Sequence, residues 1–160
     1  MRDAEFEALY AAEAQGLYGF LAYRTGDRSL AEDLLADTFE RALRSRKRYD
    51  AARGSRRTWL YAIAMNLLRD HARRAAAEGR AIEKVGHAVP GGGGEELDSV
   101  ERRDELQRAL ATLTEEEREA IALRFGAELT VPEMAKLLGQ PLTTVEGRVY
   151  RALRKLRGRL

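Results

Sequence analysis

Cysteine is absent from this chain of 160 residues, and only two histidines are present. Without thiols, neither disulfides nor thiolate metal sites can form. Four consecutive glycines stand at 91–94, but no strand precedes them and no helix follows at once, so they do not form a phosphate-binding loop. These absences argue against an enzyme and predict no catalytic residue, no metal site and no cofactor.

Long apolar runs are also missing, and the longest are far too short to cross a bilayer. The N-terminal segment MRDAEFEALY is acidic, unlike a secretory signal peptide. We therefore expect a soluble cytoplasmic protein with no membrane insertion.

Proline is scarce, with three in the chain, and β-branched residues are few, whereas Ala, Leu, Arg and Glu are abundant. This composition predicts an all-α protein. Capping boxes, in which a Ser or Thr precedes a Glu by three residues, stand at Ser29/Glu32 and Thr114/Glu117. The expected helices cover roughly 3–24, 29–46, 56–76, 97–111, 115–125, 131–138 and 143–157.

A glycine-rich segment, GHAVPGGGGEE, interrupts the helical pattern. A composition of this kind cannot pack a core, so we interpret it as a flexible linker at 78–100 between two small helical domains, 1–77 and 101–160. The alternative is a long surface loop within one domain. His87 lies in this segment and indicates no function.

Charge alternates along the chain although the net charge is only +2. Residues 1–45 carry 5 basic and 9 acidic side chains, and residues 46–80 carry 10 and 3. Residues 81–120 carry 5 and 11, and residues 121–160 carry 8 and 3. Two acidic-then-basic units predict two polyanion-binding surfaces, each beside an acidic surface that faces another partner.

The most informative segment is the last, LTVPEMAKLLGQPLTTVEGRVYRALRKLRGRL. A capping box at Thr130/Glu133 predicts the start of a short helix, and Gly139-Gln140-Pro141 predicts its end. A further capping box at Thr143/Glu146 predicts the start of a second, basic helix. Two short helices joined by a tight turn are typical of a helix-turn-helix, whose second helix enters the DNA major groove.

The second of these helices is amphipathic. At 100° per residue, its apolar side carries Val145, Val149, Ala152, Leu153 and Leu156. Its other side carries Thr144, Gly147, Arg148, Arg151 and Lys155, and the small Gly147 permits close backbone approach. An ordinary helical hairpin with a solvated charged face is the alternative.

A first basic surface is predicted around RSRKRYDAARGSRR and the helix TWLYAIAMNLLRDHARR. A loop at 49–55 precedes this helix, and Trp59 stands at the flank of its polar side, Thr58, Ala62, Asn66, Arg69 and Arg73. Basic residues near an aromatic suit phosphate contacts and base stacking. Trp59 could equally be an anchor of the hydrophobic core. His71 lies on the apolar side of the helix, which indicates a packed histidine and not a ligand.

Three segments together resemble the extracytoplasmic-function group of the sigma-70 family of bacterial sigma factors. AEDLLADTFERAL (31–43) is similar to that family's core-polymerase-binding helix, and RGSRRTWLYAIAMNLLRDHARR (53–74) to its -10-element segment. LTVPEMAKLLGQPLTTVEGRVYRALRKLR (129–157) is similar to its -35-element segment. The resemblance covers nearly the whole chain and implies an alternative sigma factor that directs RNA polymerase core to promoter DNA.

The resemblance also implies residue roles. The core-binding residues would be Glu32, Asp33, Asp37 and Phe39, although the apolar residues of this helix, Leu34, Leu35, Phe39 and Leu43, could instead form the domain core. The -10 region would be contacted by Tyr49, Arg53, Arg56, Arg57, Trp59, Asn66, Arg69 and Arg73. The -35 element would be contacted by Thr144, Gly147, Arg148, Tyr150, Arg151 and Lys155, the last on phosphates. Family members of this size are commonly held inactive by an anti-sigma protein, so we expect such a partner, and a monomer when the chain is free.

Glu146 stands where the family usually has Lys or Arg. Its carboxylate either caps the helix that follows Thr143, the interpretation we favour here, or accepts a hydrogen bond from a cytosine amino group. The competing function is an autonomous helix-turn-helix regulator. Such a regulator would need no acidic docking helix and would usually dimerise, and no strong dimer seam is visible.

Overall fold

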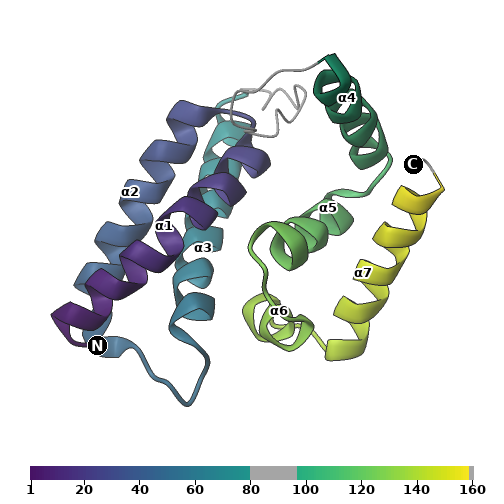
Figure 1. Ribbon diagram of the computed structural model, residues 1–160. Coiled ribbons are helices and arrows are strands. Elements are labelled where there is room, and N and C mark those ends of the chain that lie inside the picture. Colours follow the sequence, from purple (N-terminus) through teal and green to yellow (C-terminus); the bar gives the residue numbers. More distant parts are fainter. Residues whose placement is uncertain (80–96, 159–160) are drawn as a thin grey trace.

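The computed structural model describes residues 1–79 and 97–158, and every regular element in these ranges is helical (Figure 1). The first domain contains α1 (Asp3–Thr25), α2 (Arg28–Arg44), the 3-10 turn η1 (Arg46–Arg48) and α3 (Arg56–Ala77). The second contains α4 (Leu97–Ala111), α5 (Glu115–Ile121), the π-helical turn η2 (Ala122–Gly126), α6 (Val131–Leu138) and α7 (Leu142–Arg157). The all-α prediction is confirmed. Most of the expected linker, with His87, lies outside the described residues.

Two of the four predicted capping boxes are present. In α6 the Thr130 hydroxyl accepts a hydrogen bond from the Glu133 amide (3.2 Å), while the Glu133 carboxylate accepts one from the Thr130 amide (3.0 Å). Thr114 and Glu117 cap α5 in the same way, at 3.1 and 2.9 Å. Each box satisfies two backbone donors that an open helix start leaves unpaired.

The other two boxes were predicted wrongly. Gly26 ends α1 with a left-handed φ of 67°, and Asp27 then caps α2 by accepting from the Leu30 amide at 3.1 Å, so Ser29 already lies inside the helix. The helix α7 begins at Leu142 after Pro141, with no side-chain cap. The backbone decides this, because the Pro141 carbonyl accepts from Thr144 and Val145 at 3.1 and 3.2 Å, and Thr143 is therefore within the first turn.

The turn between α6 and α7 depends on Gly139. Its φ of 63° lies in the left-handed region, which glycine enters without steric cost. Pro141, with φ −58° and ψ 144°, then sets the extended entry into α7. The predicted helix at 115–125 is divided between α5 and η2, where the Ala127 amide bonds back to the Ala122 carbonyl at 2.9 Å.

The two domains share one apolar core. Leu17, Tyr61 and Met65 of the first domain belong to the same buried cluster as Leu129 and Met134 of the second. Across the seam α1 packs on η2 and α3 packs on α6, while α2 lies on the far side of the first domain (Figure 1). The described ranges contain no helix with the length and apolarity needed to cross a membrane.

Candidate polymerase and nucleic-acid interfaces

The helix α7 presents a basic face to solvent. Val145, Val149 and Ala152 bury its inner side, while Tyr150 is 65% exposed. The predicted residues Thr144 and Arg151 are also exposed, and Gly147 is half-buried. A Cβ at Gly147 would meet the Arg151 guanidinium at 3.0 Å, so the absence of a side chain lets Arg151 lie along the helix surface.

Arg148, predicted to face DNA, is instead held inside the domain. Its guanidinium donates to the Gln140 amide oxygen at 2.8 Å and lies 3.7 Å from a Glu116 carboxylate oxygen, and its side chain is only 12% exposed. These contacts tie α7 to the α6–α7 turn and to α5. Arg148 therefore fixes the position of α7 within the second domain.

Lys155 also has an intramolecular partner. Its ammonium donates to Glu117 at 2.6 Å, and the Glu117 side chain is only 6% exposed. Burial raises the pKa of Glu117, but hydrogen bonds from Lys155 and Thr114 outweigh this and lower it below its ordinary value. Lys155 thus neutralises the carboxylate that caps α5, and the predicted phosphate contact would require Lys155 to leave Glu117.

Arg154 was missed in the sequence analysis. It is exposed, and none of the described residues makes an ion pair or side-chain hydrogen bond with it. It lies three residues after Arg151 and seven after Gly147, a spacing that places all three on one helix face. That spacing could have identified it from the sequence.

The helix α3 and the loop before it carry the predicted -10 residues. The Tyr49 hydroxyl donates to the Gly54 carbonyl at 2.9 Å, and the Tyr49 and Trp59 rings meet edge-on with centroids 5.5 Å apart. Trp59 is half-buried, so it packs the loop against α3 and keeps part of its surface in solvent. The structure therefore brings Tyr49 and Trp59 together at one end of α3.

The basic side chains of this region point in different directions. Arg53, Asn66 and Arg73 are exposed, and Arg73 pairs with Asp70 on its own helix. Arg56 donates to Glu5 of α1 at 2.8 Å. The two remaining predicted residues, Arg57 and Arg69, turn toward the second domain.

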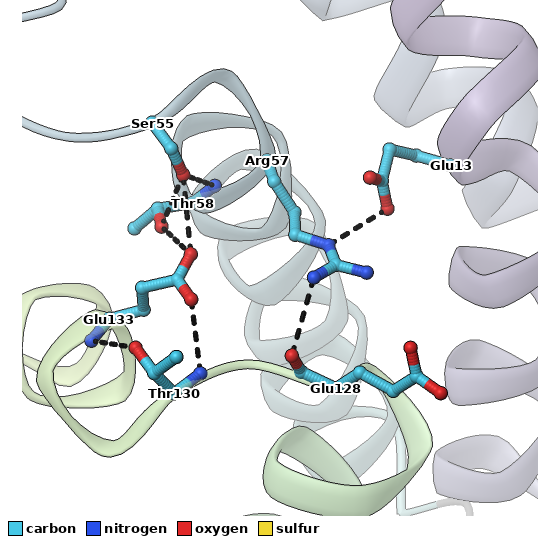
Figure 2. Close-up of polar contacts among 7 residues, drawn as sticks. All are labelled: Glu13, Ser55, Arg57, Thr58, Glu128, Thr130 and Glu133. Atoms are coloured by element: carbon cyan, nitrogen blue, oxygen red, sulfur yellow. Dashed lines mark hydrogen bonds and ion pairs between the residues drawn. The ribbon is translucent and has the colours of Figure 1, made fainter.

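A polar network closes the seam between the domains (Figure 2). Arg57 donates to the Glu13 carboxylate at 3.1 Å and to the Glu128 carbonyl at 3.3 Å. The Glu133 carboxylate accepts from the hydroxyls of Ser55 and Thr58, each at 3.4 Å. Burial raises the pKa of Glu133, but hydrogen bonds from Thr130 and Thr58 and the nearby charge of Arg57 lower it overall.

A second set of ion pairs lies elsewhere along the seam. Arg24 approaches Glu115 at 2.8 Å and Glu119 at 3.5 Å, and Arg69 approaches Glu119 at 3.8 Å. Acidic groups of the second domain thus face basic groups of the first. The alternating charge predicted a partner for these carboxylates, but nothing in the sequence indicated that part of that partner is the chain's own first domain.

The middle of α2 exposes a group of carboxylates, and the exposed arginines of this helix lie toward its two ends. Glu32, Asp33 and Asp37 are all in solvent, on the side of the first domain that the second domain does not cover. The prediction for Phe39 is wrong, because it is only 7% exposed and packs edge-on against Phe6 and Tyr10, with centroids at 6.3 and 4.7 Å. Phe39 belongs to the domain core, together with Leu34 and Thr38 of the same helix.

The fold and these surfaces define a class: a helical protein of two packed domains, with a helix-turn-helix in the second domain and exposed carboxylates on a helix of the first. The family model for sigma-70 region 2 matches residues 9–78, and the model for sigma-70 region 4 matches residues 103–156. Both halves of the chain are therefore represented in one family.

Individual relatives agree with these matches. The chain is 34% identical over 148 residues to the ECF RNA polymerase sigma factor SigC of Mycobacterium tuberculosis (strain CDC 1551 / Oshkosh), covering 91% of this chain and 78% of that protein. It is 33% identical to the RNA polymerase sigma factor CarQ of Myxococcus xanthus, with 95% and 87% covered. The sigma factor RpoE of Bartonella quintana, solved with the anti-sigma factor NepR, shares the fold, with a TM-score of 0.78, 24% identity and coverage of 97% and 96%.

The chain belongs to the extracytoplasmic-function group of the sigma-70 family. It is an alternative sigma factor, which binds RNA polymerase core and directs promoter-specific transcription initiation. The relatives match across both domains, which sets aside the alternative of an autonomous regulator that uses only its C-terminal half.

Proposed function

We propose that the two domains of this sigma factor, residues 1–77 and 101–160, bind different parts of the promoter. The exposed acidic face of α2 docks on the polymerase through Glu32, Asp33 and Asp37. The loop at 49–55 and the exposed part of α3 hold the -10 strand, and α7 reads the -35 element. Catalysis belongs to the polymerase core, and this chain supplies promoter specificity in the cytoplasm.

The separation of charge on the surface carries this proposal. The middle of α2 carries three exposed carboxylates, and α7 carries three exposed arginines that have no side-chain partner among the described residues, Arg151, Arg154 and Arg157. Because DNA is a polyanion, the basic face suits DNA and the acidic face suits a basic protein partner. One chain can therefore hold the polymerase and the promoter at the same time.

Part of the -10 surface is occupied while the two domains are packed together. Arg57 and Arg69 are in contact with carbonyl or carboxylate oxygens of the second domain, the positions that phosphates would otherwise take. We include in the proposal that DNA binding by these two residues requires the seam to open. The acidic face of α2 remains free in the packed arrangement and needs no such change.

An anti-sigma protein is a further proposed partner, and the chain itself is proposed to be monomeric. One solved structure with this fold is the sigma factor RpoE in complex with the anti-sigma factor NepR, and another is CnrH in complex with the cytosolic domain of CnrY. Pull-down from cell extract with this chain as bait tests for the anti-sigma partner. Determination of the molecular mass of the purified chain in solution tests whether it is a monomer.

In vitro transcription tests the function as a whole. Sigma-free core polymerase is incubated with fragmented host DNA, with and without this chain, and RNA 5′ ends are mapped. The expected result is a set of new start sites that share two upstream elements at a fixed spacing. No new start sites, despite binding of the chain to duplex DNA, would contradict the proposal.

A further inference from the structure

We infer that Glu146 is a specificity-determining residue of the recognition helix, and that it selects cytosine at one position of the -35 element. The inference rests on the proposed role of α7 in reading that element. The sequence is compatible with two roles for Glu146, a helix cap or a contact with a cytosine amino group, and the structure excludes the helix cap.

The capping role is excluded by the backbone. The helix α7 starts at Leu142 behind Pro141, with no side-chain cap, so Glu146 lies a full turn inside the helix. Its carboxylate is exposed and makes no ion pair or hydrogen bond with any of the described residues. By contrast, the carboxylates of Glu117 and Glu133 are both held in true capping boxes.

The position of Glu146 is where a recognition helix touches bases. Residues near the N-terminus of such a helix contact base edges in the major groove, and Glu146 is the fifth residue of α7. It stands one turn before the exposed Tyr150 on the same face, and next to Gly147, over which the Arg151 guanidinium lies.

The structure also reduces the number of other candidates. Arg148 is held by Gln140 and Glu116, and Lys155 is held by Glu117, so neither is free to read a base without losing its partner. The exposed side chains that remain on α7 are Leu142 and two threonines in its first turn, then basic and aromatic groups with a single carboxylate. Glu146 is the only acidic residue of α7.

The chemistry of a carboxylate decides what it can recognise. An ionised carboxylate only accepts hydrogen bonds, and it is repelled by phosphates. In the major groove guanine presents two acceptors and thymine presents an acceptor beside a methyl group, so both are disfavoured. Adenine offers an amino donor next to the acceptor N7, whereas cytosine offers its N4 amino group with no acceptor beside it. Cytosine is therefore the base that suits Glu146.

The test measures base preference with the complete holoenzyme. Core polymerase with this chain transcribes a promoter library randomised across the -35 element, and enrichment is compared among the parent, Glu146→Gln and Glu146→Ala. The parent is expected to prefer cytosine at one position by about 5- to 150-fold, the range for a good base contact. Glu146→Ala should lose that preference, and Glu146→Gln should move it toward adenine, which a glutamine amide pairs in a bidentate manner.

Two controls separate recognition from folding. Glu105→Gln changes an exposed glutamate of α4, outside the helix-turn-helix, and should leave every preference as in the parent. Thermal unfolding of both Glu146 variants should match the parent, because the Glu146 side chain makes no ion pair or hydrogen bond within residues 1–79 and 97–158. Initiation by all variants with unchanged preferences at every position would overturn the inference while leaving the sigma function intact. Failure of the parent to initiate from any library member would overturn both.

Discussion

Lys155 and Arg154 are neighbours on α7, and the structure predicts opposite consequences for replacing each of them with methionine. Lys155 holds the buried Glu117 carboxylate at 2.6 Å, whereas Arg154 extends into solvent. The change Lys155→Met should therefore destabilise the second domain. The change Arg154→Met should leave stability within about 0.5 kcal/mol and weaken DNA binding instead.

The size of the stability effect follows from the contact that is lost. A hydrogen bond between charged groups contributes about 1.5–3 kcal/mol, and the Lys155 side chain is 44% exposed, so water replaces part of it. Glu117 also keeps its hydrogen bonds to Thr114. We expect a loss of about 1–2 kcal/mol, and for a chain of this length each kcal/mol lowers the melting temperature by about 2–4 °C.

The effect should depend on pH in a definite direction. Because the folded-state pKa of Glu117 is lowered, its ionised form contributes stability above the unfolded pKa of about 4.3, and this contribution is lost as pH falls through the folded pKa. The difference between parent and Lys155→Met should be full at pH 7 and shrink below about pH 4. Denaturant unfolding followed by far-UV circular dichroism measures it, since the single tryptophan lies in the first domain.

Promoter binding completes the comparison. The salt dependence of holoenzyme binding should have a slope smaller by about 1 in Arg154→Met and unchanged in Lys155→Met, since each phosphate contact adds about one to the slope. The reverse pattern, with Lys155→Met as stable as the parent and a reduced salt slope, would refute the assignment of these two residues.

Three further predictions concern the other surfaces. Arg57→Met should leave the largely buried Glu13 carboxylate unpaired and lower the free energy of unfolding by about 1–2 kcal/mol. It should also increase the radius of gyration in small-angle X-ray scattering, because the seam between the domains opens. An unchanged radius of gyration would mean that Arg57 does not hold the domains together. Changing Asp33 and Asp37 to Lys should weaken core binding, most strongly at low salt, with DNA affinity of the isolated chain undiminished; unaltered core affinity in a pull-down titration would place the docking face elsewhere. Arg151→Ala should weaken discrimination at the -35 element by about 1–3 kcal/mol, measured by run-off transcription from -35 variants, and equal activity on all variants would rule out a base contact.

Much of the fold follows from local sequence signals. Thr130 and Glu133 start α6, Thr114 and Glu117 start α5, and Gly139 ends α6, all as predicted. Helix starts and ends depend on hydrogen bonds within a few residues and on backbone preferences, so they can be recognised without knowledge of the rest of the chain. The same reasoning failed at Ser29 and Thr143, because the helix begins before each of these residues, after Asp27 in α2 and after Pro141 in α7.

The candidate sites were predicted less completely than the helices that carry them. A helical wheel gives the direction in which a side chain points from the helix axis, but it does not show which residue of another element contacts that side chain. Arg148 and Lys155 fell on the polar side of α7, as the sequence indicated, yet α5 and the α6–α7 turn bring Glu116, Gln140 and Glu117 into contact with them. The prediction for Phe39 is wrong for a similar reason, because the sequence of α2 does not show that Phe6 and Tyr10 of α1 cover this side chain.

The sequence by itself determined the helical composition, the helix-turn-helix, the order of acidic and basic segments and the family resemblance. Each of these features depends on residues that are close together along the chain. The tertiary structure decided which charged groups are free. Glu128 and Glu133 meet Arg57, Ser55 and Thr58 across more than 70 residues of sequence. Contacts over such separations depend on how whole domains pack, and the packing of one shared core placed the Glu128 carbonyl and the Glu133 carboxylate against the first domain.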